Sequence, residues 1–182
     1  FDPDGHGTHV AGTIGAVGNN GLGVVGVAWR VQIMAGRFLD NTGFGATSDA
    51  VQCIDYARNK GAKIINASWG NPASSSTLES ALRRARDAGI IVVVAAGNES
   101  NNNDTDPSYP ASYNLDNIVG VAATTRTDTL ASFSDFGATT IDLAAPGVLG
   151  GQSPQGLVEV GDGLDDEVLA PVRRAAQEVG LD

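Results

Sequence analysis

His6 and His9 are the only histidines of the chain, and they lie three residues apart in segment 4–13, Asp-Gly-His-Gly-Thr-His-Val-Ala-Gly-Thr. Imidazole has the side-chain pKa nearest to neutrality, so a histidine at the start of a helix is suited to proton transfer. The flanking glycines would let a substrate main chain come close. The segment therefore predicts a general base.

The histidine pair has two other interpretations. Residues three apart share one face of a helix, so the pair also allows a metal site. A zinc-protease helix, however, carries His-Glu-x-x-His, with a glutamate between ligands that are four apart. Here the intervening residues are Gly7 and Thr8, which disfavours zinc. The remaining alternative is that one histidine packs locally and the other is exposed.

Residues 5–13 resemble the active-site histidine segment of the subtilisin-like serine proteases, the subtilase family. The resemblance implies that His6 is the catalytic base and that His9 has a structural role. It also implies peptide-bond hydrolysis through an acyl-enzyme, an extended peptide or protein substrate, no cofactor for the chemistry, and an extracellular location. The chain opens at Phe1 without a signal peptide, which is absent, removed or outside the segment.

The elements that must position these residues are read from continuous apolar runs, which are typical of strands buried on both faces. Four runs predict strands, at residues 31–38, 63–67, 90–95 and 118–122. Helical patterns lie between them and end before Gly61 and Gly89, where a helix C-cap favours glycine. Residues 76–79 have the form of a capping box. The order predicts an α/β fold, a parallel sheet with helices on both faces.

Asn98 follows the apolar run 90–95, at the end of a strand where α/β folds keep their ligand sites. A side-chain amide held there can donate to the oxyanion that forms when a peptide carbonyl is attacked. The resemblance extends to this segment and implies that Asn98 is the side-chain donor of the oxyanion hole. The alternative is that Gly97 and Asn98 form an ordinary turn.

Two glycine-containing segments resemble the edges between which the family binds its substrate by β-augmentation. They are Gly43, Phe44 and Gly45, and Ser68, Trp69 and Gly70. We expect an exposed aromatic side chain in each, with two ordinary loops as the alternative. The first specificity pocket would be lined by Ala95, Ala96 and Gly97, whose small size predicts a slot for a large apolar side chain.

The nucleophile and the acid of a serine-protease triad are not found in the sequence. The family's aspartate lies on a strand upstream of the histidine segment, and its serine lies in Gly-Thr-Ser-x-Ala-x-Pro, a string that does not occur here. Ser153 is only a partial match, and spacing puts Glu167 in the serine's place. We therefore expect an incomplete endopeptidase domain over residues 1–148 that does not hydrolyse peptides as given. The alternative is an inactive relative or truncated product that at most binds extended peptides.

Composition changes after residue 148. Residues 149–182 carry seven acidic side chains against two arginines, and the polar pattern predicts a surface helix over residues 165–179. The whole chain of 182 residues has 21 acidic and 11 basic side chains and a net charge of −10. This charge disfavours nucleic acid and anionic membranes as partners, and no apolar run is long enough to cross a bilayer. Oligomeric state is left open.

Oxygen-bearing side chains near the histidine segment and after Asn98 suggest a structural calcium site. They are Asp2, Asp4 and the polar residues of segment 101–106. A solvated polar loop is the other interpretation. Cys53, the single cysteine, is expected to be a small apolar residue of the core.

Overall fold

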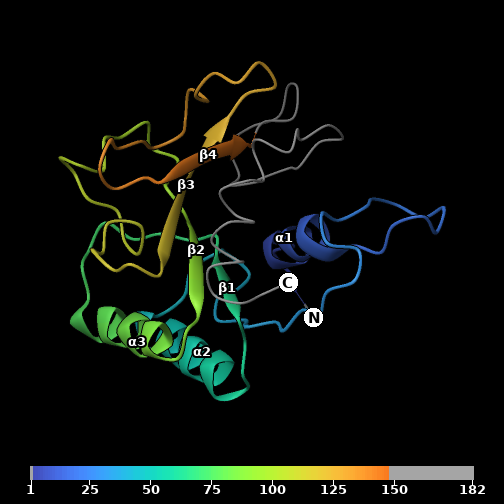
Figure 1. Cartoon of the computed structure of the whole chain (residues 1–182), viewed down its shortest axis with the longest axis horizontal. Helices are drawn as coiled ribbons and strands as arrows, with labels where there is room; N and C mark the ends of the chain where they lie inside the picture. Colours follow the sequence, from blue (N-terminus) through green and yellow to red (C-terminus); the bar gives the residue numbers. More distant parts are fainter. Residues whose placement is uncertain (1, 148–182) are drawn as a thin grey trace.

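A computed structural model describes residues 2–147, in which four strands form one parallel sheet in the order β1-β2-β3-β4 (Figure 1). The strands are β1 (Ile64–Ala67), β2 (Ile91–Ala95), β3 (Ile118–Thr124) and β4 (Leu143–Pro146). The predicted boundary at residue 148, the acidic segment and its predicted helix at 165–179 lie outside the described residues.

The centre of the sheet is β2, which pairs in parallel with β1 on one side and β3 on the other. Val92 and Val94 alternate with half-buried neighbours and are 0% and 1% exposed. Ala67 at the end of β1 is level with Val94, so the carboxyl ends of the two strands lie side by side. Segments that leave these ends are thereby brought to one edge of the sheet.

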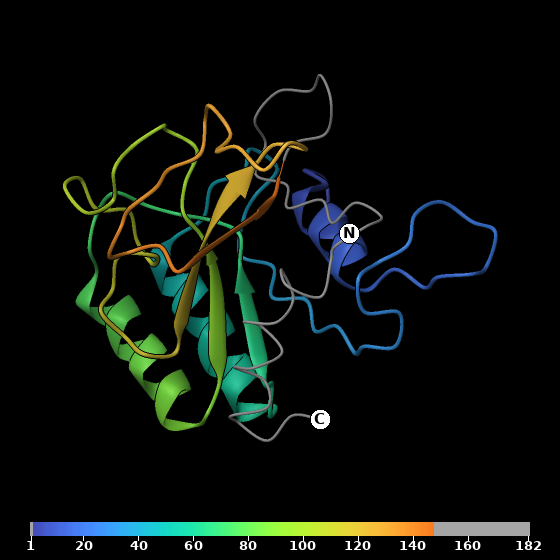
Figure 2. The same ribbon diagram turned by 45° about the horizontal axis from the view of Figure 1, so that its top comes forward.

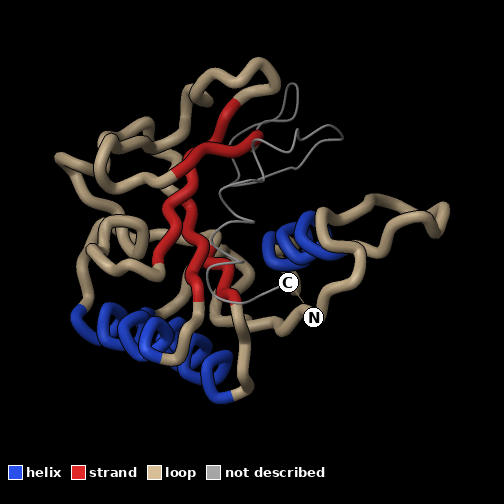
Figure 3. Tube along the Cα trace, in the orientation of Figure 1, coloured by secondary structure: helices blue, strands red, loops and turns tan. Residues whose placement is uncertain are grey.

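Helices α2 (Thr47–Asn59) and α3 (Ser76–Asp87) pack against each other and cover one face of the sheet (Figures 1 and 3). The α3 face turned to the core is apolar and buried, and it consists of Leu78, Ala81, Leu82 and Ala85. Helix α1 (His6–Gly15) lies on the other side of the sheet in both views (Figure 2). The predicted α/β fold, a parallel sheet with helices on both sides, is confirmed.

The ends of α2 and α3 agree with the sequence in part. Gly61 and Gly89 follow the two helices with φ of +79° and +73°, the left-handed conformation that favours glycine at this position. The predicted capping box is wrong by one residue. The N-cap of α3 is Ser75, whose hydroxyl accepts a hydrogen bond from Leu78 N at 3.3 Å. Glu79 instead pairs with Arg83 at 2.6 Å on the helix surface.

The strand predicted at residues 31–38 is not formed. Val31, Ile33 and Met34 are 46–47% exposed, and the segment runs as irregular chain. A strand needs a neighbour to satisfy its main-chain groups, and β1 is the edge of the described sheet, with no described strand on its outer side. The apolar run indicates a buried strand, but within the described residues it pairs neither with the outer edge of β1 nor with another strand.

Candidate active site

His6 is held where α1 begins and reaches across to the end of β1. The preceding residue, Gly5, has φ of +86° and starts the helix in a left-handed turn. The Nε2 atom of His6 lies 3.0 Å from the main-chain oxygen of Ser68, 62 positions further along the chain. This contact ties the predicted base to one of the two predicted substrate edges.

The contact also defines the tautomer of the His6 ring. A carbonyl oxygen only accepts hydrogen bonds, so Nε2 must carry the proton that is donated to Ser68. In the neutral ring, the free lone pair is then on Nδ1. A serine-protease triad uses the other arrangement, with Nδ1–H donated to the acid and Nε2 accepting from the serine. His9, the second histidine, is exposed on α1.

Asp2 fixes the start of α1. Its Oδ2 accepts from the main-chain N and the hydroxyl of Thr8, both at 2.8 Å, and its Oδ1 accepts from Gly5 N at 3.2 Å. The hydrogen bonds from Thr8, above all that of its hydroxyl, lower the pKa of the Asp2 carboxyl. The sequence suggested only a calcium ligand here, although an aspartate just before a helix is also a common capping signal.

The predicted edge at Ser68 lies directly beyond β1 and outside the strands. The residue after this edge, Asn71, pairs with another segment of the chain. It exchanges two main-chain hydrogen bonds of 2.8 Å with Tyr109. Trp69 is half-buried against the core, and its ring meets that of Phe38 edge-on at a centroid distance of 5.2 Å. The expectation of an exposed tryptophan is therefore wrong, because the ring is used for packing.

The second predicted edge is a turn closed by Asp40. Phe44 is 76% exposed, as expected, and Gly43 has φ of +79°. Both main-chain groups of Phe44 contact Asp40, since its O accepts from Asp40 N at 2.8 Å and its N donates to Asp40 Oδ1 at 3.2 Å. The Thr42 hydroxyl, foremost among its donors, lowers the pKa of Asp40. Sequence reasoning missed Asp40, although aspartate shortly before Thr and Gly is a turn signal.

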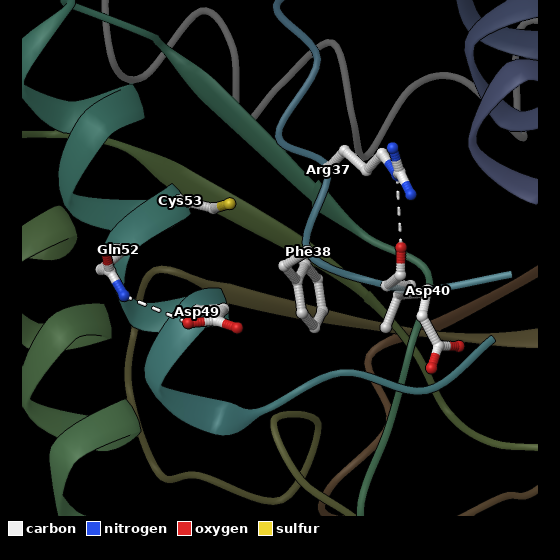
Figure 4. Close-up of a pocket in the computed structure, with 7 residues that line it drawn as sticks. Arg37, Phe38, Asp40, Asp49, Gln52 and Cys53 are labelled. Atoms are coloured by element: carbon white, nitrogen blue, oxygen red, sulfur yellow. Dashed lines mark hydrogen bonds between the residues drawn. The ribbon is translucent and has the colours of Figure 1, made fainter. Parts of the chain in front are cut away.

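An open cavity of about 460 Å³ lies beside this turn (Figure 4). Its lining residues come from the loop before the turn and from α2: Arg37, Phe38, Leu39, Asp40, Asp49, Gln52 and Cys53. Figure 4 shows the Phe38 ring between the loop and the helix. Burial raises the pKa of the Cys53 thiol, which keeps it protonated, in agreement with the expected packing role.

Asn98 is exposed on the loop that leaves β2. Its main-chain N donates to Glu99 Oε2 at 2.8 Å, so this N–H is already used. Ala95 and Gly97 are half-buried, whereas Ala96 is 1% exposed and contributes no open surface to a pocket. Because β1 and β2 end side by side, this loop and Ser68 leave the same edge of the sheet.

The carboxylates that suggested calcium do not converge. Within residues 2–147, no group of three or more His, Cys, Asp or Glu side chains is placed to hold a metal ion. Asp104 accepts from Ala138 N at 2.8 Å and from the Thr139 and Thr140 hydroxyls at 2.9 and 2.8 Å. Desolvation raises the pKa of Asp104, but these hydrogen bonds outweigh it and lower the pKa overall. The described residues thus give the calcium hypothesis no support.

None of the helices described in residues 2–147 has the length and apolar character needed to span a membrane.

Comparison with known proteins gives consistent matches. The Subtilase family pattern matches residues 2–169, past the point where the motifs end. Thermitase from Thermoactinomyces vulgaris is 44% identical over 144 residues, which cover 79% of this chain and 50% of thermitase. Subtilisin Savinase from Lederbergia lenta is 44% identical over 147 residues, covering 81% and 52%.

Solved structures agree with the sequence matches. A protease from Pseudoalteromonas arctica PAMC 21717 superposes with a TM-score of 0.72 at 39% identity, covering 85% of this chain and 46% of the protease. A cold-adapted subtilisin-like serine proteinase superposes with a TM-score of 0.62 at 34% identity, covering 80% and 50%. The chain spans about half the length of these relatives. With its histidine segment, its parallel sheet and these matches, the chain belongs to the subtilase family.

Proposed function

We propose that this chain supplies the general base, the peptide groove and an oxyanion donor of a subtilisin-like serine endopeptidase. The observation that carries the proposal is the 3.0 Å contact between His6 Nε2 and Ser68 O, which joins base and substrate edge. The reaction class is peptide-bond hydrolysis through an acyl-enzyme. The serine motif and the upstream acid are not found in the 182 residues, so the complete reaction needs both to be supplied.

In the proposed reaction each residue has one role. A substrate in extended conformation pairs with the main chain of Ser68–Gly70 and of Gly43–Gly45, for which Phe44 must give up its two hydrogen bonds to Asp40. The His6 ring accepts the proton of the nucleophile on Nε2 and later gives it to the leaving amine. For this, the ring must give up its hydrogen bond to Ser68 and change tautomer. The Asn98 side-chain amide donates to the oxygen that becomes negatively charged.

Substrates, cofactors and location follow the family. The substrate is a peptide or protein chain, no cofactor takes part in the chemistry, and the site of action is extracellular. The net charge of −10 supports this choice of partner against nucleic acid.

A second candidate function is peptide binding without hydrolysis. It is favoured by the His6 tautomer, in which the proton on Nε2 points to Ser68 O rather than leaving that nitrogen free for a serine. Both candidates need the same groove and differ only in the nucleophile.

Two measurements on the purified chain test whether it carries a nucleophile of its own. Incubation with a chromogenic peptide and a serine-directed fluorophosphonate is expected to give neither turnover nor labelling. If the probe labels the wild type and His6→Ala abolishes this labelling, a nucleophile is present among the 182 residues. That result would exclude the binding-only candidate.

The groove itself is tested by titrating the chain with an extended peptide and with its main-chain N-methylated form. N-methylation removes the donors that β-pairing needs, so we expect the affinity to fall by about tenfold or more. Equal affinity for the two peptides, or no binding of either, would contradict the proposed groove. The DNA on both sides of the coding segment would show whether an acid strand and a serine helix accompany it.

A further inference from the structure

The loop that carries Asn98 is anchored to a segment more than thirty positions away. We call residues 97–101 the Asn98 loop. Ser100 N donates to Phe133 O at 2.9 Å, and Phe136 N donates to Asn101 O at 2.9 Å. The conformation of the loop therefore does not depend on its own short sequence alone. It is fastened to the segment that precedes β4.

Asp135 makes three hydrogen bonds to residues of the Asn98 loop. Its Oδ1 accepts from Glu99 N at 2.8 Å and from Asn101 N at 2.9 Å. Its main-chain N donates to Gly97 O at 3.0 Å. The residues on both sides of Asn98 are thus hydrogen-bonded to Asp135. These bonds fix the position of the main chain from which the Asn98 side chain extends.

The packing between Asp135 and Gly97 leaves no space. Gly97 has φ of +126°, and a Cβ at this position would collide with Asp135 Oδ2 and lie 3.0 Å from Glu99 Oε2. Asp135 is 1% exposed, and its Oδ2 has no hydrogen-bond partner within the described part of the chain. A buried carboxylate oxygen without a donor is costly. Stability alone therefore does not account for a carboxylate here.

We infer that Asp135 is the positioning residue of the Asn98 loop, and that it acts through the acceptor geometry of Oδ1. The inference rests on the proposed function in one respect, the role of Asn98 as an oxyanion donor. Such a donor is effective because it is oriented before the charge develops, so that no reorganisation is needed. The Asn98 main-chain N–H is bound to Glu99, which leaves the side-chain amide for the substrate oxygen.

The first test is hydrogen exchange on the full chain, with Asp135→Ala, Asp135→Asn and a control. Asp135→Ala removes both acceptor contacts, and we expect the Glu99 and Asn101 amides to exchange at least about tenfold faster, with Val92 and Val94 unchanged. Asp135→Asn keeps Oδ1 and should retain wild-type protection at Glu99 and Asn101. The control is Asp142→Ala, which removes a 2.7 Å contact to Gly120 N in β3 and should leave the Asn98 loop unchanged.

Two results would overturn the inference. The first is unchanged exchange at Glu99 and Asn101 in Asp135→Ala. The second is loss of protection in Asp135→Asn, which would show that charge and not acceptor geometry holds the loop. If Asp135→Ala does not fold, Asp135→Asn decides by the same criterion. Gly97→Ala then provides a second check, because its Cβ should displace Asp135 and speed exchange at the same two amides.

The second test uses peptide affinity to measure whether the Asn98 side chain is correctly oriented. A peptide ending in a free carboxylate places an anionic oxygen where the oxyanion would lie, whereas its amide does not. We expect the wild type to bind the acid about tenfold more tightly than the amide, and Asp135→Asn to keep this preference. Asn98→Ala and Asp135→Ala should lose it. A preference that survives in Asp135→Ala would contradict the positioning role.

The two tests also separate the inference from the proposed function. If the wild type binds neither peptide, the proposed function fails and Asp135 has no substrate to serve. The exchange experiment still decides independently whether Asp135 orders the loop.

Discussion

The imidazole of His6 donates from Nε2 to the main-chain oxygen of Ser68, so that the predicted base and the predicted substrate edge share one hydrogen bond of 3.0 Å. The two residues are 62 positions apart and belong to α1 and to the segment that follows β1. A substrate that pairs with Ser68 competes for the same carbonyl. Substrate binding and the proton position on His6 are therefore linked.

The tautomer can be measured directly. In the neutral ring of His6 we expect the proton on Nε2 and the lone pair on Nδ1, because Ser68 O can only accept. Long-range proton–nitrogen NMR correlations distinguish the two forms. His6 is assigned by its loss in His6→Gln, with His9 as the internal reference. A ring with its proton on Nδ1 would mean that the contact to Ser68 is not made in solution.

The N-cap of α3 gives a matched pair of variants. Ser75→Ala removes the acceptor of Leu78 N and should lower the free energy of unfolding by about 1 kcal/mol. Ser76→Ala changes the first helical residue and should be nearly neutral. Urea unfolding measures both. If Ser76→Ala lowers the free energy of unfolding more than Ser75→Ala does, the capping box predicted from the sequence would be correct.

An ion pair joins α2 to α3 and makes stability depend on pH. Asp55 accepts from Arg84 Nε at 3.0 Å and from Arg84 Nη2 at 2.7 Å, and these hydrogen bonds lower the pKa of Asp55 in the folded state. The folded state therefore binds this proton more weakly than the unfolded chain. The stabilisation is present above the ordinary aspartate pKa of about 3.9 and is lost as the pH falls through the lower folded value.

Asp55→Asn should remove this part of the acid dependence. The pair is about one-third exposed, so its coupling is small, about 0.5 kcal/mol in a double-mutant cycle with Arg84→Gln. Urea unfolding at pH 7 and at pH 3 measures it. Coupling that is as large at pH 3 as at pH 7 would contradict the assignment to the Asp55 carboxylate.

The two tryptophans should respond differently to a quencher. Trp29 is 54% exposed, whereas Trp69 is half-buried against Phe38 and the core. In Trp29→Phe only Trp69 emits, and in Trp69→Phe only Trp29 does. We expect stronger acrylamide quenching and a more red-shifted emission from Trp29. Equal quenching in the two variants would show that the segment around Trp29 is folded onto other residues in solution.

The residue pattern predicted secondary structure correctly where burial of apolar side chains determines it. The apolar run that becomes β2 has Val92 and Val94 in the interior, and glycine at 61 and 89 follows helix ends as its φ requires. The run at 31–38 is also mainly apolar, although it includes Gln32 and Arg37, and it forms no strand, because strand formation depends on a partner that a pattern does not contain.

The candidate site was predicted unevenly. His6 and Asn98 are assigned to it through family motifs, while Asp135 was missed because an aspartate in a polar segment is normally solvated. Only the fold reveals that its side chain is 1% exposed and hydrogen-bonded beside Asn98. Trp69 was misread for the opposite reason, since its packing on Phe38 depends on a contact across 31 positions of chain.

Within residues 2–147 no strand pairs with the outer edge of β1, and this bears on how the chain behaves in concentrated solution. An open strand edge presents a row of main-chain donors and acceptors that the same edge of a second molecule can satisfy. Ile64, 54% exposed, adds an apolar contact at this edge, and β1 carries no charged residue of its own to oppose pairing. The net charge of −10 opposes such pairing by long-range repulsion, and salt screens that repulsion. Raising the ionic strength should therefore promote self-association of this chain through β1.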